Sequence, residues 1–466
     1  MYLSLKDSGL TLEAIAKFTK GTVSSGDPSL TAHDISIDSR TVQPGDAFVA
    51  IVGDRFDGHD YVSVAAEKGA IFAVVSRVPD SCPIPCVVVP DTRAALGDIA
   101  RGYKQFFRAF SVAVTGSVGK TTTKQFIYSV LDTKYKTNET KGNFNNEIGL
   151  PLTLLGLNAS HKALVVEMGM SQRGEISALS KIAEPDISVI TGIGTSHIEH
   201  LGSREAIRDA KMEIVDGMKA GGILILNGDD PLLRDVQADD ICKITVGIDN
   251  NGCVYKAENI RMFGDHTIFD VRMHDGDLLT DLRINVIGKH NIYNALIACV
   301  VGVLLGVPEE KIRYGLLNFT PAEMRQAIVE KDGFTVIEDC YNASPESMNA
   351  GLDVLCRTAE NKNARAVAVL GDMLELGHVS ESAHFDIGNQ AARCGVSRLI
   401  TFGKAASKIA AGAIAAGMDE SAITVIEDTE NAEDAAKIIR ATLQKGDVVL
   451  FKASRAIALE RVIQLL

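Results

Sequence analysis

The chain has 466 residues, of which 46% are hydrophobic and 23% are charged, proportions that are ordinary for globular proteins. At roughly 100–200 residues per domain, this length predicts about three domains. The net charge of -13, from 47 basic and 60 acidic residues, repels a phosphate backbone and argues against nucleic acid as a partner. An anionic nucleotide would need a local basic pocket instead.

Eight cysteines are scattered along the chain, and the closest pair, Cys82 and Cys86, has no His or Cys partner at zinc spacing. We therefore expect reduced thiols, as in cytoplasmic proteins. Residues 1–7 show neither the basic nor the apolar segment of a secretory signal. The longest apolar run, residues 295–307, is shorter than the roughly 20 residues that span a bilayer. These features predict a soluble, cytoplasmic protein with no membrane partner.

The first block of the chain, residues 1–83, mixes a short predicted helix at 12–18 with small strands such as 47–52. It ends in a proline-rich stretch, residues 78–85, which is typical of a boundary between domains. We therefore expect a small α/β domain there.

The second block, residues 84–316, alternates short apolar strands with amphipathic helices, a pattern that favours a parallel sheet with helical crossovers. Hairpin-like strands follow between residues 244 and 286, as at 267–272, and predict an antiparallel subsheet before a helix at 291–305. The four apolar strands are expected at residues 111–114, 163–166, 187–191 and 223–226.

The third block, residues 317–466, restarts the alternation of strands and helices and predicts a second, Rossmann-like α/β unit. The whole chain is therefore expected to be an α/β protein of three domains. Strands of the last domain are predicted at residues 335–338, 366–370, 399–402, 424–426 and 448–451.

A phosphate-binding loop is predicted directly after the strand at 111–114. Its glycines permit close approach of the backbone to a phosphate, and the helix that follows adds its N-terminal amides. Lys120 would reach the β- and γ-phosphates, and the Thr121 hydroxyl would bind Mg²⁺. The strict eight-residue pattern would need a glycine at Val114, so this is the shorter form, which by itself indicates ATP or GTP. The loop reads Thr115, Gly116, Ser117, Val118, Gly119, Lys120, Thr121 and Thr122.

Three further polar residues are candidates for metal binding. Glu167 ends the strand at 163–166, where a carboxylate can hold Mg²⁺ beside a phosphate loop. His197 follows the strand at 187–191, although histidine is a poor Mg²⁺ ligand. Lys211 lies on a helix that we expect Ser203 to cap. Each has a plain structural alternative: an exposed strand-end glutamate, a capping or core histidine, and a lysine that extends along the surface into solvent.

The order of these residues resembles the Mur ligases of peptidoglycan synthesis. The phosphate loop is followed by Glu167, His197 and Lys211, and then by the segment Gly-Lys-His-Asn-Ile-Tyr-Asn-Ala at 288–295. Within the family, the chain looks most like the members that join D-alanyl-D-alanine to a UDP-N-acetylmuramoyl-tripeptide with ATP. The resemblance runs from residues 38–40 to 452–455, and its most specific segments are residues 142–151, 167–170 and 369–377.

The resemblance implies roles for individual residues of the ATP site. The phosphate loop, Gly116 to Thr122, would bind ATP, with Lys120 and Thr121 on its phosphates and first Mg²⁺ and Glu167 also on metal. His197 and Lys211 would hold a second Mg²⁺, with Lys211 carbamylated to an anionic ligand. The catalytic set would then be Lys120, Glu167, His197 and Lys211.

The remaining implied roles concern the UDP-substrate and the adenine and ribose of the nucleotide. The N-terminal domain, with Ser39 and Arg40, would hold the UDP-sugar. Asn143, Asn145 and Asn146 would lie on the substrate side of the site. The resemblance also suggests a monomer. Four residues would complete the nucleotide site, two near the adenine and two from the C-terminal domain on phosphate and ribose: Asn291, Asn294, Arg325 and Asp339.

A few positions depart from the family pattern. Cys340 and Ser344 stand where Ser and Asn are commoner, and Ala453 stands where Gly is usual; by the resemblance these positions lie near the ATP ribose and the surface on which the domains close. Two alternatives remain open: a related ligase that adds a single amino acid, such as the diamino-acid-adding Mur enzyme or a folylpolyglutamate synthetase, and a nucleotide-switch module without ligase chemistry. The sequence does not indicate whether the tripeptide ends in diaminopimelate or lysine.

Overall fold

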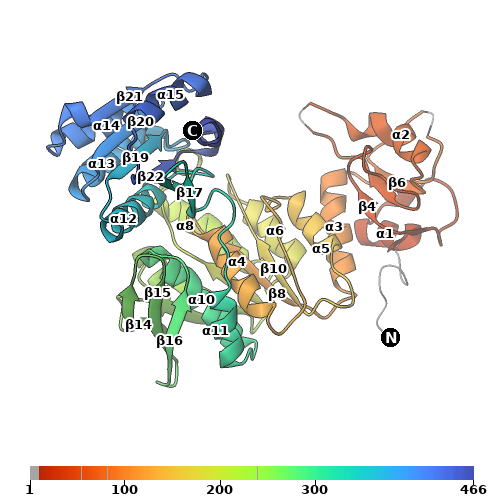
Figure 1. Ribbon diagram of the computed structural model, residues 1–466. Helices are drawn as coiled ribbons and strands as arrows, with labels where there is room; N and C mark the ends of the chain where they lie inside the picture. Colours follow the sequence, from red (N-terminus) through yellow and green to blue (C-terminus); the bar gives the residue numbers. More distant parts are fainter. Residues whose placement is uncertain (1–9, 54, 81, 239) are drawn as a thin grey trace.

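The computed structural model of the protein describes residues 10–53, 55–80, 82–238 and 240–466. The prediction made for residues 1–7 lies outside these ranges. Within them, three sheets of five, nine and six strands form three α/β domains that follow one another along the chain (Figure 1). The N- and C-terminal domains lie on opposite sides of the central one. No helix in the described part of the chain is long and apolar enough to cross a membrane.

The N-terminal sheet has the strand order β2-β7-β6-β5-β4, with parallel pairing from β4 to β7 and β2 antiparallel at the edge. The helix predicted at 12–18 is present as α1 (Leu12–Thr19). Because β7 pairs with β6, the sheet continues past residue 83, where the sequence analysis placed the boundary. The strands are β2 (Thr22–Val23), β4 (Ile35–Ser36), β5 (Ala47–Val49), β6 (Phe72–Val75) and β7 (Cys86–Val88).

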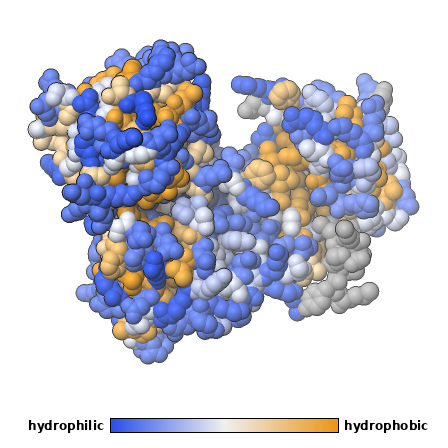
Figure 2. Space-filling view, viewed as in Figure 1, coloured by the Kyte–Doolittle hydropathy of each residue, from blue (hydrophilic) through white to orange (hydrophobic). Residues whose placement is uncertain are grey.

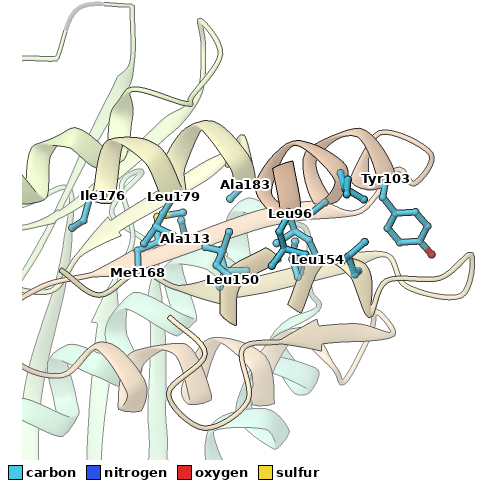
Figure 3. Close-up of a cluster of buried hydrophobic side chains, with 14 of the residues drawn as sticks. Leu96, Tyr103, Ala113, Leu150, Leu154, Met168, Ile176, Leu179 and Ala183 are labelled. Atoms are coloured by element: carbon cyan, nitrogen blue, oxygen red, sulfur yellow. The ribbon is translucent and has the colours of Figure 1, made fainter. Parts of the chain in front are cut away.

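Helix α3 (Thr92–Lys104) joins the N-terminal and central domains. Its first turn is capped by Asp91, whose side chain accepts hydrogen bonds from two backbone amides. Its apolar face packs both on α1 and on α5 (Gly149–Leu155) of the central domain, so one continuous core crosses the boundary. Figure 3 shows Leu96 and Tyr103 of α3 beside side chains of the central domain. The Tyr103 hydroxyl also donates to the Leu157 carbonyl, at 2.7 Å.

The central sheet has the order β16-β15-β14-β13-β12-β11-β8-β10-β9. Pairing is parallel from β9 to β14 and antiparallel from β14 to β16, which confirms the predicted antiparallel subsheet. All four predicted apolar strands are present. The strands are β8 (Phe110–Thr115), β9 (Thr137–Glu139), β10 (Ala163–Glu167), β11 (Ile187–Ile190), β12 (Ile223–Asn227), β13 (Cys242–Gly247), β14 (Tyr255–Met262), β15 (Thr267–Arg272) and β16 (Leu278–Ile284).

Helix α4 (Lys120–Leu131), which starts at the phosphate loop, is held by a dense apolar core. Phe126 of α4 is fully buried and stacks on Phe319, with ring centroids 3.5 Å apart. On α11 (Glu309–Leu317), Gly315 lets the backbone approach α4, because a Cβ there would lie 2.6 Å from the Val130 Cα. The last turns of α10 (Lys289–Leu304) pack on the same helix. These contacts fix the direction in which α4 presents its first turn.

The C-terminal sheet has the order β17-β18-β22-β19-β20-β21, parallel except for the edge strand β17. Helices flank the parallel part, which confirms the predicted Rossmann-like layout, and all five predicted strands are present. The elements are β17 (Ala327–Lys331), β18 (Phe334–Glu338), β19 (Ala366–Gly371), β20 (Arg398–Phe402), β21 (Ile423–Ile426), β22 (Val448–Lys452), α12 (Pro345–Asn361), α13 (Ser380–Arg393), α14 (Ser407–Ala415) and α15 (Ala432–Thr442).

Replacement of Phe126 by alanine tests how firmly α4 is anchored. We expect Phe126→Ala to lower the free energy of unfolding by about 3–5 kcal/mol, because it removes a fully buried ring and leaves a cavity. Urea denaturation followed by circular dichroism measures the change. Phe56→Ala, at a ring that is 69% exposed, is the control and should change stability by less than about 0.5 kcal/mol. Equal effects of the two variants would contradict this account of α4.

Candidate active site

The phosphate loop lies between β8 and α4, as predicted, and is fastened to the end of β11. Ser117 donates its amide to the Gly192 carbonyl at 2.9 Å, and the Thr191 hydroxyl donates to the Val118 carbonyl at 2.5 Å. Gly116 has a φ of 147°, and a Cβ there would lie 1.9 Å from the Thr191 Oγ1. Only glycine can therefore occupy position 116 with Thr191 in place.

The first turn of α4 offers free amides toward the loop. Gly119 precedes the helix with a φ of 85°, and no side chain caps this end. Uncapped amides and the helix dipole together make a binding site for anions. The Ser117 Oγ is buried and has no hydrogen-bond partner among the described residues. The loop therefore has donors available for phosphate oxygens.

Lys120 adds a cation to this site. Its Nζ donates to the Gly116 carbonyl at 2.8 Å, so the side chain folds back over the loop. Burial lowers the pKa of Lys120, Glu167 nearby raises it, and the Arg325 guanidinium lowers it further. Lys120 of the central domain and Arg325 of the C-terminal domain thus both bring positive charge to the phosphate loop. This arrangement suits a polyanion such as a nucleoside triphosphate.

Glu167 ends β10 beside the loop and is 2% exposed. One carboxylate oxygen accepts from the Thr121 hydroxyl at 2.7 Å, and the other accepts from the Asn145 Nδ2 at 2.9 Å. Among the described residues, no three His, Cys, Asp or Glu side chains gather to hold a metal. A single carboxylate beside a hydroxyl nevertheless fits Mg²⁺, which commonly takes its remaining ligands from phosphates and water.

His197 lies at the start of α7 (Ile198–Leu201) with a φ of 65°. Its Nδ1 is 2.5 Å from the Glu375 Oε2 of the C-terminal domain, although the two atoms are not aligned for a hydrogen bond. Burial lowers the pKa of His197 despite the opposing effect of Glu375, and Lys120 and Lys211 lower it further. The lowered pKa favours the neutral imidazole, which is the form that binds metal ions.

Lys211 lies on α8 (Arg204–Met212), whose first turn is capped by Ser203 as predicted. The side chain is 1% exposed, and its Nζ forms no hydrogen bond or ion pair with any described residue. Burial, with Lys120 nearby, holds the pKa of Lys211 well below its usual range. The alternative that Lys211 extends along the surface into solvent is therefore wrong. No described residue balances a positive charge on its amine.

A cleft of about 1020 Å³ separates the central and C-terminal domains, and the phosphate loop opens into it. From the C-terminal side, Arg325 stacks over the Tyr341 ring, 4.2 Å from its centroid. Asp339 follows β18 and pairs with Lys452 at 2.7 Å. Lys452 is 2% exposed and also donates to the Asn342 carbonyl, so it fixes the direction of the Asp339 carboxylate.

Asn291 and Asn294, on α10, line the same cleft and are connected to the loop helix. Asn294 accepts from the Thr123 hydroxyl of α4 at 2.8 Å and donates to the Asn291 Oδ1 at 3.3 Å. Asn291 donates in turn to Gln326, which belongs to the connection into the C-terminal domain. This relay holds α4, α10 and that connection in register.

The predicted substrate residues are distributed differently. Asn145 and Asn146 line the cleft, but Asn143 does not. The Asn146 side chain accepts hydrogen bonds from the amides of Ile148 and Gly149 at the start of α5, so it shapes the loop locally. Ser39 and Arg40 lie in the N-terminal domain, away from this cleft.

Sequence reasoning missed three residues of the site. Thr191 ends a predicted strand, but only the three-dimensional contact with Gly116 reveals its role. Glu346 lies in the first turn of α12 and reaches across the cleft to the central domain. Lys452 lies one residue beyond the strand predicted at 448–451, within the segment 452–455 of the family resemblance, and it ends β22, which pairs with β18 before Asp339.

The fold and the cleft define a class of protein: an enzyme that binds a nucleotide on a phosphate loop and completes the site with a third domain. Family models match most of the chain. They are described as "Mur ligase family, catalytic domain" at residues 31–104, "Mur ligase middle domain" at 114–302 and "Mur ligase, glutamate ligase domain" at 324–455. The chain belongs to the Mur ligase family.

Individual relatives resemble the chain over nearly its whole length. It is 37% identical to the UDP-N-acetylmuramoyl-tripeptide–D-alanyl-D-alanine ligase of Bacillus subtilis, over 97% of each chain. The crystal structure of MurF from Acinetobacter baumannii matches with a TM-score of 0.88 and 31% identity, over 98% of each chain. MurF ligase from Thermotoga maritima, in complex with ADP, matches with a TM-score of 0.82 and 31% identity, over 93% of this chain and 96% of that chain. The predicted three-domain α/β architecture is confirmed.

The contact between Gly116 and Thr191 can be tested by adding one methyl group. We expect Gly116→Ala to weaken binding of a non-hydrolysable ATP analogue by at least about tenfold, because the Cβ would collide with the Thr191 hydroxyl in a backbone conformation that alanine rarely adopts. Isothermal titration calorimetry measures the affinity.

The matched control is Gly276→Ala in the hairpin between β15 and β16. Gly276 has a φ of 93°, but a Cβ there would meet nothing within 4 Å. This variant carries the backbone strain without the collision, and its nucleotide affinity should equal that of the unmodified protein. Unchanged affinity in Gly116→Ala would show that the loop does not hold the phosphates.

Proposed function

We propose that this chain is the ATP-dependent ligase that joins D-alanyl-D-alanine to UDP-N-acetylmuramoyl-tripeptide, with release of ADP and phosphate, in the synthesis of peptidoglycan precursors. The observation that carries the proposal is full-length similarity to ligases named for this reaction, combined with an intact phosphate-loop cleft. The ADP in the Thermotoga maritima structure supports ATP as the nucleotide.

The reaction has two steps. An oxygen of the tripeptide carboxylate attacks the γ-phosphorus, the bond to the β-phosphate oxygen breaks, and ADP leaves with that electron pair. The product is an acyl phosphate. The amine of D-alanyl-D-alanine then attacks the acyl carbon, loses a proton, and expels phosphate. No side chain of the protein is needed as a nucleophile.

The residues of the cleft serve the first step by reducing the repulsion between two anions. The loop amides and Lys120 hold the β- and γ-phosphates, and Arg325 adds positive charge from the C-terminal domain. Preorganised positive charge of this kind stabilises the charge that spreads over the transferred phosphoryl group. Holding the carboxylate in line lowers the barrier further.

Thr121 and Glu167 would hold Mg²⁺ here, and His197 and Lys211 would hold a second ion. The metal supplies charge neutralisation of the phosphate oxygens when it is bound. Asn145, which donates to Glu167, orients that carboxylate. On the other side of the cleft, Asp339 would accept from a ribose hydroxyl, and Asn291 and Asn294 would lie near the adenine.

Lys211 is proposed to act as a carbamate. The side chain is 1% exposed and has no described partner, and burial lowers the pKa of its amine, which favours the neutral form that reacts with carbon dioxide. Addition of carbon dioxide to Nζ, with loss of one proton, converts the amine into an anionic oxygen ligand. Such an anion would balance the positive charge of Lys120 and of a metal ion.

The N-terminal domain is proposed to hold the UDP-sugar through Ser39 and Arg40. The Arg40 side chain is 86% exposed, and Asp38 beside it is its side-chain partner. Hydrophobic residues gather on this domain where it faces the central one (Figure 2). A monomer is proposed from the family resemblance alone. Its eight free cysteines fit work in the reducing cytoplasm.

The acceptor specificity gives the main test of the function. With ATP, Mg²⁺ and purified UDP-N-acetylmuramoyl-tripeptide, we expect phosphate release with D-alanyl-D-alanine as acceptor. Single amino acids, including glutamate, should give little release. A coupled phosphate assay measures the rate, and running diaminopimelate- and lysine-containing tripeptides in parallel identifies the third residue. Preference for a single amino acid would instead place the chain with the other ligases.

Lys120→Ala is the active-site variant for the same assay. It should abolish ADP release while binding of the UDP-substrate persists, because the lysine contacts the phosphate loop and no described residue of the N-terminal domain lines the cleft around it. Lys445→Ala, at an exposed surface lysine, is the matched control and should retain full activity.

Carbamylation of Lys211 can be observed without an activity assay. Protein prepared with ¹³C-bicarbonate should show a carbamate signal in its ¹³C spectrum, and Lys211→Ala should lack it. That variant should also lose activity and recover part of it with short-chain carboxylic acids. Lys219→Ala, at an exposed lysine shortly after α8, should keep both signal and activity. A fully active protein with no carbamate signal would contradict the proposal.

A further inference from the structure

Glu346 forms a direct link between the C-terminal domain and the loop that carries His197. Its carboxylate accepts from the Thr195 amide at 2.9 Å and from the Thr195 hydroxyl at 3.1 and 3.3 Å. The Thr195 amide and hydroxyl have no other partner among the described residues. Both donors therefore depend on the C-terminal domain.

Glu346 is held in position by the start of its own helix. The hydroxyls of Ser344 and Ser347 accept each other's backbone amides, and Pro345 occupies the first turn of α12. This reciprocal capping leaves the backbone at residue 346 little freedom. The carboxylate is therefore delivered to the loop by a rigid element.

The loop between β11 and α7 is shaped to receive this carboxylate. The three atoms nearest to a Cβ built at Gly194 all belong to Glu346, with the carboxylate carbon at 2.6 Å and both oxygens at 2.8 Å. Gly194 does not have a positive φ, so its backbone would accept alanine. The glycine is therefore required by the space that Glu346 occupies.

The central domain fixes the loop just before this point. Asp230 accepts from the Ile193 amide at 2.7 Å, and Arg204 donates to the Ile193 carbonyl at 2.7 Å. Beyond Thr195, the C-terminal domain touches the loop again, where Glu375 approaches His197. The segment at 194–197 thus has its anchors in two different domains.

We propose that Glu346 is a positioning residue, which sets the loop bearing His197 when the C-terminal domain lies against the central domain. The inference rests on the proposed ligase function, because it assigns the loop a task within that reaction. Glu346 also lines the cleft, and its carboxylate oxygens accept the hydrogen bonds of Thr195 there. It acts through Thr195, two residues before His197, and so couples domain contact to the geometry of the site.

Two single variants and their combination test the proposal. Glu346→Ala and Gly194→Ala should each lower kcat by roughly 10- to 100-fold, because small displacements of catalytic groups cost about this much. The KM for the UDP-substrate should stay unchanged, since the N-terminal domain is not involved. The double variant should be no slower than Glu346→Ala alone, because the added methyl group would no longer meet a carboxylate. Independent effects would multiply instead.

Hydrogen exchange gives a readout that does not depend on turnover. In the presence of an ATP analogue, exchange in the peptide covering residues 192–199 should be faster in Glu346→Ala, because the Thr195 amide loses its acceptor. Glu360→Ala is the matched control: it removes an exposed carboxylate from the same helix, and that carboxylate has no partner among the described residues. Its exchange and kcat should match the unmodified protein.

The outcomes separate the two proposals. Absence of phosphate release by the unmodified protein would reject the ligase function. With an active unmodified protein, normal kcat and exchange in Glu346→Ala would overturn the positioning role. The role would also be overturned if Gly194→Ala were equally damaging with and without Glu346. Loss of kcat in both single variants, suppression in the double variant and faster exchange would support it.

Discussion

The missing side chain at Gly116 allows the phosphate loop to lie directly against the end of β11, and the rest of the site depends on this contact. Once the loop is fastened to Thr191 and Gly192, α4 begins with its amides directed into the cleft. Lys120 and Thr121, the first residues of that helix, then have fixed positions beside Glu167. The apolar contacts of Phe126 keep the helix from shifting along its axis. The lack of a Cβ at Gly116 thus determines where the charged groups of Lys120 and Glu167 lie.

Much of the fold could be predicted because buried strands leave a strong local signal. The apolar runs at β8, β10, β11 and β12 are fully or almost fully buried in a parallel sheet, so their composition alone identified them. The same topology explains why the residues at strand ends were good candidates: parallel strands bring their carboxyl ends to one edge. Glu167 and the loop meet there as expected.

The rest depends on contacts that no local pattern records. The proline-rich stretch at residues 78–85 resembles a domain boundary, yet the strands before and after it, β6 and β7, pair in parallel within the first sheet. Glu346 follows a proline at the start of a capped helix, and nothing near it in sequence indicates a partner some 150 positions earlier. Lys211 had the pattern of a surface lysine, whereas tertiary packing leaves it 1% exposed. Burial of a charged residue is decided by the neighbouring domain elements rather than by periodicity.

The continuous core around α3 makes the three domains mechanically unequal. The N-terminal domain shares its apolar interior with the central one, whereas the buried clusters of the C-terminal domain are built almost wholly from its own residues. Severing the backbone near residue 320 would release a fragment that already contains its own interior. Severing the backbone near residue 90 would expose the apolar surfaces through which the N-terminal and central domains pack on each other. The protein therefore divides into two parts with separate interiors: the N-terminal and central domains, which share one core, and the C-terminal domain, which contributes Glu346 and Arg325 to the cleft.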